Sequence, residues 1–328
     1  MRSWLLPEYI EDILPAEAER TEAQRRVLLD HFRAHGYRLI QPPLIEHLDS
    51  LLTGTGRDLE LQTFKVVDPL SGRLLGVRAD ITPQAARIDA HLLNEPGITR
   101  LCYAGSVLRA VAVGNAKTRE VIQIGAELFG EPAIAGDVEV LGLLLSALAA
   151  AGGRGLHLDL GHVGVYRALA AGAGIAGNTE DTELFAALSA KDMPAVTELT
   201  ARLPAAWRDA LGALPTLYGP AQDVLAAARA RLPDTPAIRN ALEALAELAR
   251  SAQAHVAALH IDLADLTGYH YHNGAIFSVF TPGEPEAIGR GGRYDGVGRA
   301  FGRARPATGF TLDLRQLAGV VAREARPA

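Results

Sequence analysis

The sequence predicts an α+β protein with an antiparallel sheet flanked by helices and a helical insertion within the chain. β-Branched, alternating segments occur before residue 166 and again after residue 255. Between them the composition shifts to Ala, Leu, Arg and Glu, and aromatic residues make up only 5% of the 328 residues. This composition favours alanine-rich helix packing over an aromatic-filled β-sandwich. We therefore expect one core from residues 1–166 and 255–328, with 167–254 as the helical insertion.

Local signals predict the first elements in order. Residues 17–37 carry apolar side chains at helical spacing and end in a glycine and a tyrosine, which predicts an amphipathic helix stopping near His35. Residues 38–46 form a short strand interrupted by two prolines. Residues 59–80 alternate on both sides of an Asp-Pro-Leu-Ser-Gly turn and predict a β-hairpin. A helix follows, with Thr82 as its N-cap and a proline at its first position.

The remaining elements are mostly strands. Residues 98–113 and 119–130 alternate and are joined by a short polar loop, which predicts a second antiparallel pair. The long apolar run 138–153 predicts a buried helix, and residues 155–166 predict a strand after it. The strand pattern resumes at residue 255 and continues to residue 317. No internal repeat is visible.

Composition excludes several classes of protein. The single cysteine, Cys102, cannot form an internal disulfide, and the N-terminus lacks the apolar run of a secretory signal. The run 138–153 contains Glu139 and is shorter than the roughly 20 residues that span a bilayer. The net charge of −6 comes without a dense Lys/Arg block. We expect a cytoplasmic protein without a membrane segment or a nucleic-acid partner.

The stretch LTGYHYHNG raises the question of a metal site. His270 and His272 lie two residues apart, but the chain has one cysteine and neither an HExxH nor a CxxC pattern. A His-x-His pair on a strand is more often a hydrogen-bonded polar face than a ligand set. We therefore expect neither a metal nor a cofactor.

Two pairs of polar residues and one arginine are candidates for binding a small ligand. Asp80 and Thr82 lie two apart at a strand end and so share a face, where they could receive an ammonium group. Gln123 and Glu127 share one side of a strand and offer amide and carboxylate hydrogen-bonding groups. Arg109 could grip a carboxylate. The alternatives are a helix-capping cluster, a half-exposed strand and a solvated arginine.

Glycines are concentrated in GRGGRYDG, residues 289–296. The segment lacks the lysine and hydroxyl of a GxxxxGK[ST] phosphate loop. Four glycines in eight residues allow close approach of a ligand or another strand. A simple glycine-rich turn is the alternative.

Together and in this order, these segments resemble histidyl-tRNA synthetases, which have the class II aminoacyl-tRNA synthetase fold. RADITPQA (78–85) is similar to their Arg-Pro-Glu-Gly-Thr stretch, and residues 107–130 match their motif 2 loop without a gap. LTGYHYHNG (266–274) resembles the histidine-specific stretch, 289–296 its glycine-rich partner, and 308–317 stands where motif 3 belongs. The resemblance covers essentially the whole chain.

The resemblance implies a histidine pocket. Its seven expected residues are Asp80, Thr82, Arg109, Gln123, Glu127, Tyr271 and His272. The ammonium group would lie near Asp80, Thr82 and Glu127, the carboxylate near the arginine, and the side chain near the remaining three residues. A strict strand would point Tyr271 and His272 to opposite faces, so that either one alone contacts the ligand or the strand bulges.

Departures from the synthetase pattern bear on function. Thr267 stands in place of the arginine that activates the carboxylate, Val111 in place of a motif 2 glutamate, and Gln316 in place of the motif 3 arginine that holds ATP phosphates. Loss of these charges should abolish adenylation, because electrostatic stabilisation is usually the largest catalytic term. The chain also ends at Ala328, where the resemblance would require an anticodon-binding domain to follow.

A retained amino-acid pocket with a degraded ATP site resembles the regulatory subunits of ATP phosphoribosyltransferase. That resemblance implies a subunit without catalytic residues, a short-form catalytic subunit as partner, L-histidine as effector, and a homodimeric core within a hetero-oligomer. Two alternatives remain open at this point. One is an amino-acid-adenylating synthetase paralogue acting on a non-tRNA acceptor, and the other is an RNA-binding module descended from the synthetase.

Overall fold

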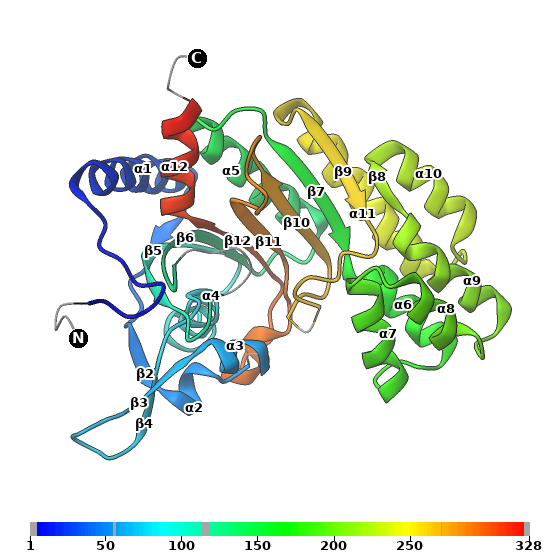
Figure 1. The fold of residues 1–328 in the computed structure, drawn as a ribbon, viewed down its shortest axis with the longest axis horizontal. Coiled ribbons are helices and arrows are strands. Elements are labelled where there is room, and N and C mark those ends of the chain that lie inside the picture. The colour runs from blue at the N-terminus through cyan, green and yellow to red at the C-terminus, as the bar shows by residue number, and fades with distance from the viewer. Residues whose placement is uncertain (1–4, 55–56, 113–117, 270, 325–328) are drawn as a thin grey trace.

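A nine-stranded sheet runs through the centre of the protein in the computed structural model, which describes residues 5–54, 57–112, 118–269 and 271–324 (Figure 1). In spatial order its strands are β1 (Arg38–Leu39), β5 (Thr99–Leu108), β6 (Glu120–Phe129), β12 (Ala307–Asp313), β11 (Gly289–Arg293), β10 (Ala275–Phe280), β7 (His157–His162), β9 (Ala258–Asp262) and β8 (Tyr218–Pro220). The pairs β1–β5 and β7–β9 are parallel, and the other neighbours are antiparallel. The sheet is mixed, which corrects the prediction of an antiparallel sheet.

A second, three-stranded sheet lies beside the first. It consists of β2 (Ile45–His47), β4 (Leu74–Val77) and β3 (Phe64–Val67), all antiparallel, and short helices α2 (Leu48–Leu51) and α3 (Arg57–Gln62) adjoin it. The hairpin predicted over residues 59–80 is confirmed as β3 and β4. The proline pair divides the predicted strand 38–46, so that its ends enter different sheets as β1 and β2.

Three helices pack together against the large sheet. They are α1 (Pro15–Ala34), α5 (Ile134–Ala150) and α12 (Leu314–Glu324), and α1 contacts both of the others (Figure 1). The predicted helix ending near His35 is confirmed, and so is the buried apolar helix. Phe32 of α1 packs edge-on against Phe310 of β12, with ring centroids 5.7 Å apart, and both are buried. This contact ties the first helix to the last strand of the sheet.

The segment expected to be a helical insertion forms most of one end of the molecule (Figure 1). Its helices are α6 (Val163–Ala173), α7 (Thr179–Ser189), α8 (Met193–Thr200), α9 (Ala205–Ala213), α10 (Ala221–Arg231) and α11 (Pro236–Ala252), with 3-10 turns at Leu214–Thr216 and Gln253–His255. The segment also contributes β8, which pairs with β9 at the edge of the large sheet. None of the described helices is long and apolar enough to cross a membrane.

One strand ends earlier than the sequence suggests. The predicted strand 155–166 stops at His162, because the imidazole Nδ1 of this residue accepts the backbone N–H of Gly164 at 3.1 Å and caps α6. Residues 163–166, VGVY, have the composition of a strand, but they form the first turn of the helix. Helix N-caps normally use hydroxyl, carboxylate or amide side chains, so the sequence carried no recognisable start signal here.

Candidate functional site

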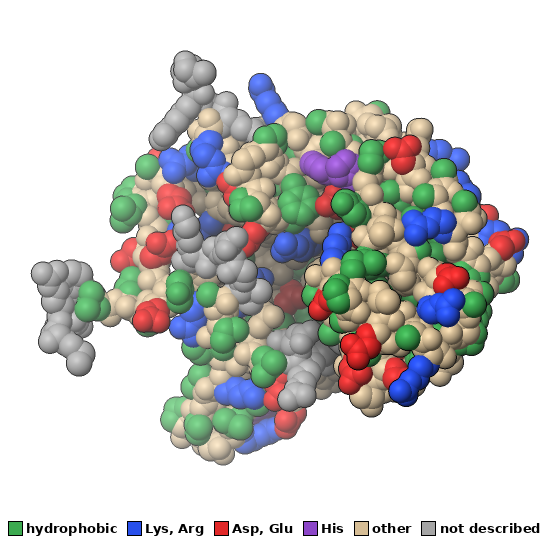
Figure 2. Space-filling view, turned by 45° about the vertical axis from the view of Figure 1, so that its right-hand side comes forward, with side chains coloured by type: hydrophobic (Ala, Val, Ile, Leu, Met, Phe, Trp, Pro, Cys, Tyr) green, Lys and Arg blue, Asp and Glu red, His purple; other side chains and the backbone are tan. Residues whose placement is uncertain are grey.

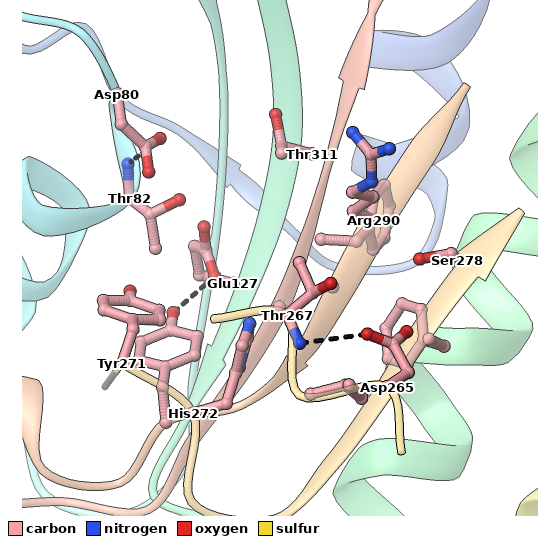
Figure 3. A pocket seen from close by; sticks show the side chains of 16 residues that line it. Asp80, Thr82, Glu127, Asp265, Thr267, Tyr271, His272, Ser278, Arg290 and Thr311 are labelled. Atoms are coloured by element: carbon pink, nitrogen blue, oxygen red, sulfur yellow. Dashed lines mark hydrogen bonds between the residues drawn. The ribbon is translucent and has the colours of Figure 1, made fainter. Parts of the chain in front are cut away.

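A small cavity of about 160 Å³ opens among strands of the large sheet and two connecting segments (Figure 3). Figure 2 shows a hollow in this part of the molecule, with acidic and basic side chains inside it. The polar side chains that line the cavity are those of Asp80, Thr82, Glu127, Asp265, Thr267, Tyr271, His272, Ser278, Arg290, Tyr294 and Thr311. The lining therefore carries carboxylates and one arginine around aromatic rings, a composition suited to a small zwitterion.

Glu127 lies at the buried end of the cavity on β6. Its side chain is 1% exposed, Oε1 accepts the Tyr103 hydroxyl at 2.9 Å, and Oε2 accepts the Tyr294 hydroxyl. Burial raises the pKa of Glu127 to about 8, despite the two tyrosine hydrogen bonds, which favour the charged form. Burial therefore favours the protonated form of Glu127 over a wider pH range than in an exposed glutamate.

This raised pKa predicts a pH dependence of stability. Between pH 4.5 and about 8 the folded carboxyl keeps its proton while the unfolded carboxyl has lost it, so the unfolded state binds fewer protons and stability falls as pH rises. The loss is complete above the folded pKa. Burial lowers the pKa of both His162 and His272 to about 4. These two neutral histidines stabilise the fold, and this stabilisation is lost as pH falls. The change is confined to pH values below about 6.5, so it does not overlap the decline caused by Glu127 above that pH.

We expect Glu127→Gln to remove the decline between pH 6.5 and 8. At about 1.4 kcal/mol per pH unit, the free energy of unfolding of the variant should gain up to about 2 kcal/mol on that of the natural chain across this interval. Urea unfolding at pH 6.5 and 8 measures both slopes. Glu19→Gln, an exposed change on α1, is the control. Equal slopes for the natural chain and Glu127→Gln would refute the assignment.

Asp80 lies in the turn between β4 and α4 (Thr82–Arg87), a helix that continues as a π-helical turn over Ile88–Leu93. Its Oδ1 accepts the backbone N–H of Thr82 at 3.1 Å and the amide Nε2 of Gln123 at 2.8 Å. The predicted N-cap is wrong: Thr82 is the first helical residue, and its hydroxyl hydrogen-bonds with that of Tyr103 at 3.1 Å. Asp80 thus supplies the oxygen at the helix start, and Thr82 is free to face the cavity.

The segment containing Tyr271 and His272 is a turn, which corrects the strand predicted here. Gly268 adopts a φ of +70°, and its carbonyl accepts the backbone N–H groups of Tyr271 and His272 at 2.8 and 2.7 Å. The turn brings both side chains to the cavity, so the expectation that neighbouring residues face opposite sides does not apply (Figure 3). Arg167 holds the turn from α6 by donating to the carbonyls of Tyr269 and His272. His270 lies outside the described residues.

Two features of this turn prepare it for a ligand. The Tyr271 ring stacks on that of Tyr294, with centroids 4.9 Å apart, and its buried hydroxyl has no hydrogen-bond partner among the described residues. His272 Nδ1 lies 3.2 Å from the carbonyl of Arg293, which can only accept, so Nδ1 carries the proton. Because the ring is neutral at physiological pH, Nε2 is left as an acceptor.

The structure does not bring all seven expected residues into one cavity. Arg109 and Gln123 instead line a neighbouring cavity of about 740 Å³. The amide of Gln123 is occupied by Asp80 and by the backbone N–H of Ile81, which it accepts at 2.8 Å. Asp80, Thr82, Glu127, Tyr271 and His272 remain together in the small cavity.

Residues that the sequence reading missed complete the site. Arg290 borders both cavities, while Arg293, three residues on, points to the opposite face of β11 and forms a buried ion pair with Asp137 at 2.7 Å. On a strand, residues three positions apart face opposite sides. Alternation over 289–293 was therefore the sequence signal that could have assigned these two arginines to different faces. The same segment is a strand and not a turn, and Gly291 is required because a Cβ there would overlap the carbonyl of Gly309.

The larger cavity is lined by Gln316, which stands where the resemblance places an ATP-binding arginine, and most of its charges are balanced. Arg315 pairs with Glu11 and Glu17 at 2.9 Å each, and Arg323 pairs with Glu284. The side-chain amide of Gln316, in place of the motif 3 arginine, donates to a backbone carbonyl at 3.3 Å. A triphosphate would have to displace these carboxylates, which is unfavourable.

Comparison with known proteins gives the family of this chain. A histidyl-tRNA synthetase family profile matches residues 9–317. The ATP phosphoribosyltransferase regulatory subunit of Ralstonia nicotianae is 59% identical over 328 residues, which is all of this chain and 84% of that protein. The corresponding subunit of Thiobacillus denitrificans is 59% identical over 317 residues, or 97% of this chain and 98% of that protein.

The chain belongs to the family of ATP phosphoribosyltransferase regulatory subunits. Proteins of this family are regulatory subunits and not catalytic chains, as expected from the three departures at Thr267, Val111 and Gln316.

Solved structures confirm the class II synthetase fold. An ATP phosphoribosyltransferase regulatory subunit/histidyl-tRNA synthetase from Bacillus halodurans superimposes with a TM-score of 0.86 at 26% identity, over 97% of this chain and 83% of that one. A histidine–tRNA ligase subunit from Alicyclobacillus acidocaldarius gives a TM-score of 0.77 at 25% identity, over 99% of this chain and all of that one. The family therefore keeps the synthetase architecture.

Proposed function

We propose that this chain binds L-histidine in the small cavity and, as a regulatory subunit, activates a short-form ATP phosphoribosyltransferase and makes it sensitive to histidine. That enzyme would catalyse the first step of histidine biosynthesis. Family membership supports the partner. The observation that carries the ligand is the buried Glu127 carboxyl beside a neutral imidazole acceptor and a tyrosine hydroxyl that has no partner in the described part of the chain.

The geometry favours one orientation of histidine. The ammonium group lies at Asp80 and Thr82, where a carboxylate already faces the cavity. The imidazole ring lies against the ring of Tyr271, which is itself stacked on Tyr294, and donates an N–H to Glu127. This reverses part of the orientation expected from the sequence, in which Glu127 received the ammonium group. Aromatic walls with a carboxylate at the end suit an imidazole better than an ammonium group.

Arg290 is proposed to hold the ligand carboxylate, in place of Arg109. It faces the cavity across from the Asp80 end, and its guanidinium is exposed enough to meet an incoming ligand (Figure 3). A carboxylate at one end and an ammonium group at the other match the opposite charges of the lining. The separation of these charges favours a ligand that carries both groups over one that carries a single group.

The two arginines give a direct test of this orientation. We expect Arg290→Ala to weaken histidine binding by about tenfold, a typical cost for losing a partly exposed charge pair. Arg109→Ala, in the neighbouring cavity, should change affinity by less than about threefold. Calorimetric titration of both variants in the assembled complex compares them. A larger loss of affinity for Arg109→Ala than for Arg290→Ala would restore Arg109 as the residue that holds the carboxylate, as predicted from the sequence.

Calorimetry also tests the proposal as a whole. Histidine is titrated into this chain, into the short-form catalytic subunit, and into their complex. We expect saturable binding that requires this chain and that histidinol, which lacks the carboxylate, reproduces only weakly. Absence of binding in all three titrations would remove the proposal. Histidine-dependent exchange between ATP and pyrophosphate would instead support an adenylating activity.

The regulatory role requires coupling to a partner. We propose a homodimeric core that assembles with the catalytic subunit into a hetero-oligomer. A ligand shifts activity only if it binds one state of the complex better than another, usually by roughly 1–3 kcal/mol. Arg167 of α6 holds the turn that carries Tyr271 and His272 by hydrogen bonds to its carbonyls. A shift of this turn on ligand binding would therefore be transmitted to the helical segment.

A further inference from the structure

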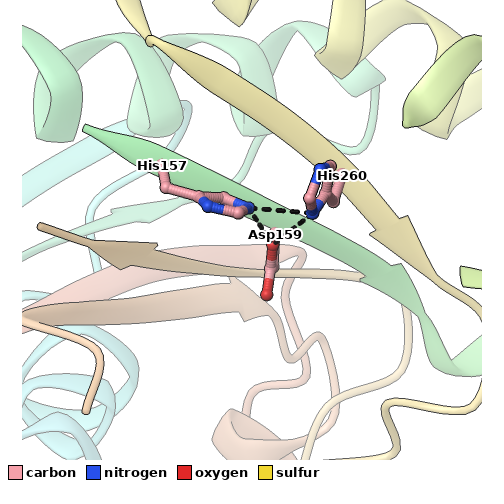
Figure 4. A group of neighbouring side chains, drawn as sticks. All are labelled: His157, Asp159 and His260. Carbon is pink, nitrogen blue, oxygen red and sulfur yellow. Dashed lines mark hydrogen bonds and ion pairs between the residues drawn. The ribbon is translucent and has the colours of Figure 1, made fainter. Parts of the chain in front are cut away.

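A second cluster of reactive side chains lies outside the histidine pocket. His157 and Asp159 of β7 and His260 of β9 project from the same face of two paired strands (Figure 4). The alternate residues Leu158, Leu160, Leu259 and Ile261 point the other way and are buried. The three polar side chains are between one-third and one-half exposed. None of them lines the pocket.

The three ligand-type atoms of this cluster face one another. His157 Nε2 lies 3.0 Å from His260 Nδ1 and 3.0 Å from Asp159 Oδ1, and His260 Nδ1 lies 4.0 Å from the same oxygen. A zinc ion with bonds of about 2.0–2.1 Å to tetrahedral ligands holds those ligands roughly 3.3 Å apart. The observed separations bracket this value. Only small side-chain rotations would be needed to place one ion between the three atoms.

Hydrogen bonding within the protein leaves the cluster incompletely satisfied. Among the described residues, the buried Oδ1 of Asp159 has no hydrogen bond of normal geometry, and its nearest polar neighbour is the Nε2 of His157 at 3.0 Å. The two imidazole nitrogens at 3.0 Å need one proton between them, and a ring that donates to the other ring cannot donate to the carboxylate from the same atom. A cation at the centre would interact with all three atoms at once.

We propose that His157, Asp159 and His260 bind one divalent transition-metal ion, with Zn²⁺ as the best geometric match. Two imidazoles and a carboxylate are a ligand set that such ions accept, and among the described residues this is the group of three whose atoms converge closely enough. The exposed side leaves a fourth position to water. The proposal is independent of histidine binding.

The site would join parts of the chain that are distant in sequence. His157 and His260 are 103 residues apart, and their strands flank the helical segment that contains α6 to α11. An ion here would fasten the parallel pair β7–β9, whose strands precede and follow that segment in the chain. Asp159 is also the cross-strand partner of Ser278, a residue of the pocket lining, so the two sites are neighbours on the sheet.

Zinc titration of the untagged full chain tests the site. The chain is dialysed against a chelator, and ZnSO₄ is added in competition with a chromophoric indicator. We expect saturation at one equivalent. Loss of a direct ligand should cost at least as much as the roughly 10–100-fold that loss of an outer partner costs. His157→Ala and His260→Ala should therefore each weaken binding by about 100-fold, and His255→Ala, an exposed histidine outside the cluster, should leave it unchanged.

Two further measurements keep the test decisive. Asp159→Asn preserves the shape of the side chain and should also weaken zinc binding, with circular dichroism confirming an unchanged fold. Cobalt(II) should give the intense visible absorption of a tetrahedral site in the natural chain and lose it in this variant. Failure to saturate at one equivalent would overturn the proposal. So would a folded Asp159→Asn or His157→Ala chain that binds zinc with the affinity of the natural chain.

Discussion

Glu127→Gln should weaken histidine binding by about 100-fold while making the folded chain more stable at pH 8. The two effects have one cause. The carboxylate is fully buried, so its charge is costly when the pocket is empty and becomes favourable only when a ligand N–H reaches it. Removing one partner of a buried, hydrogen-bonded polar pair costs about 2–5 kcal/mol of binding free energy. A neutral amide avoids the buried charge and loses the ligand.

Opposite signs for stability and affinity separate this prediction from misfolding. Calorimetric titration with histidine and urea unfolding at pH 8 are made on the same preparation. Glu19→Gln on the exposed face of α1 should alter neither quantity. A Glu127→Gln chain that binds histidine as well as the natural chain does would place the ligand elsewhere. A chain that is both weaker in binding and less stable would show that Glu127 has a mainly structural role.

Asp80→Asn should weaken histidine binding by about 30-fold. Asn keeps the oxygen that accepts the backbone N–H of Thr82, so the start of α4 is preserved while the charge facing the ammonium group is lost. Asp80 is only partly buried, and the cost therefore falls near the lower end, about 2 kcal/mol, of the range for charge pairs.

Ligand analogues identify which group Asp80 contacts. The affinity of the natural chain for imidazole-propionate, which lacks the ammonium group, should already be low, and Asp80→Asn should reduce it little further. Asp223→Asn, an exposed change on α10, is the control. An equal loss of affinity for histidine and for imidazole-propionate would mean that Asp80 does not hold the ammonium group.

The sequence predicted those parts of the fold whose signals are local. The amphipathic pattern of α1, the turn chemistry between β3 and β4, and the alternation of β5 and β6 each lie within about 30 residues, and the structure confirms them. The parallel pairs β1–β5 and β7–β9 join strands separated by much longer segments. No local pattern records such pairings, so the sheet was expected to be antiparallel.

The errors at the site have equally specific causes. Tyr-His-Tyr-His imitates strand alternation, but Gly268 turns the chain and places Tyr271 and His272 on the same cavity. Arg109 and Gln123 align with substrate positions in sequence, yet they face the larger cavity. Arg290 was overlooked because its contribution depends on which face of β11 meets the cavity. The sequence therefore identified the segments of the site more reliably than the orientation of their side chains.

The larger cavity differs from the small one in how its charged side chains are paired. Its arginines at 315 and 323 are paired with carboxylates of the same cavity, and the motif 3 arginine is replaced by Gln316. The small cavity, by contrast, keeps its carboxylates, aromatic walls and arginine. The charges of the small cavity thus remain available to a ligand, whereas those of the larger cavity are paired within the protein.

The central claim is tested most directly by phosphoribosyl transfer to ATP from phosphoribosyl pyrophosphate. The short-form catalytic subunit is assayed with and without this chain, across a range of histidine concentrations, and with the Glu127→Gln chain in parallel. We expect the natural chain to raise the rate and to confer inhibition by histidine, and the variant to raise the rate while losing histidine sensitivity. A rate and a histidine response that are the same with and without this chain would contradict the account.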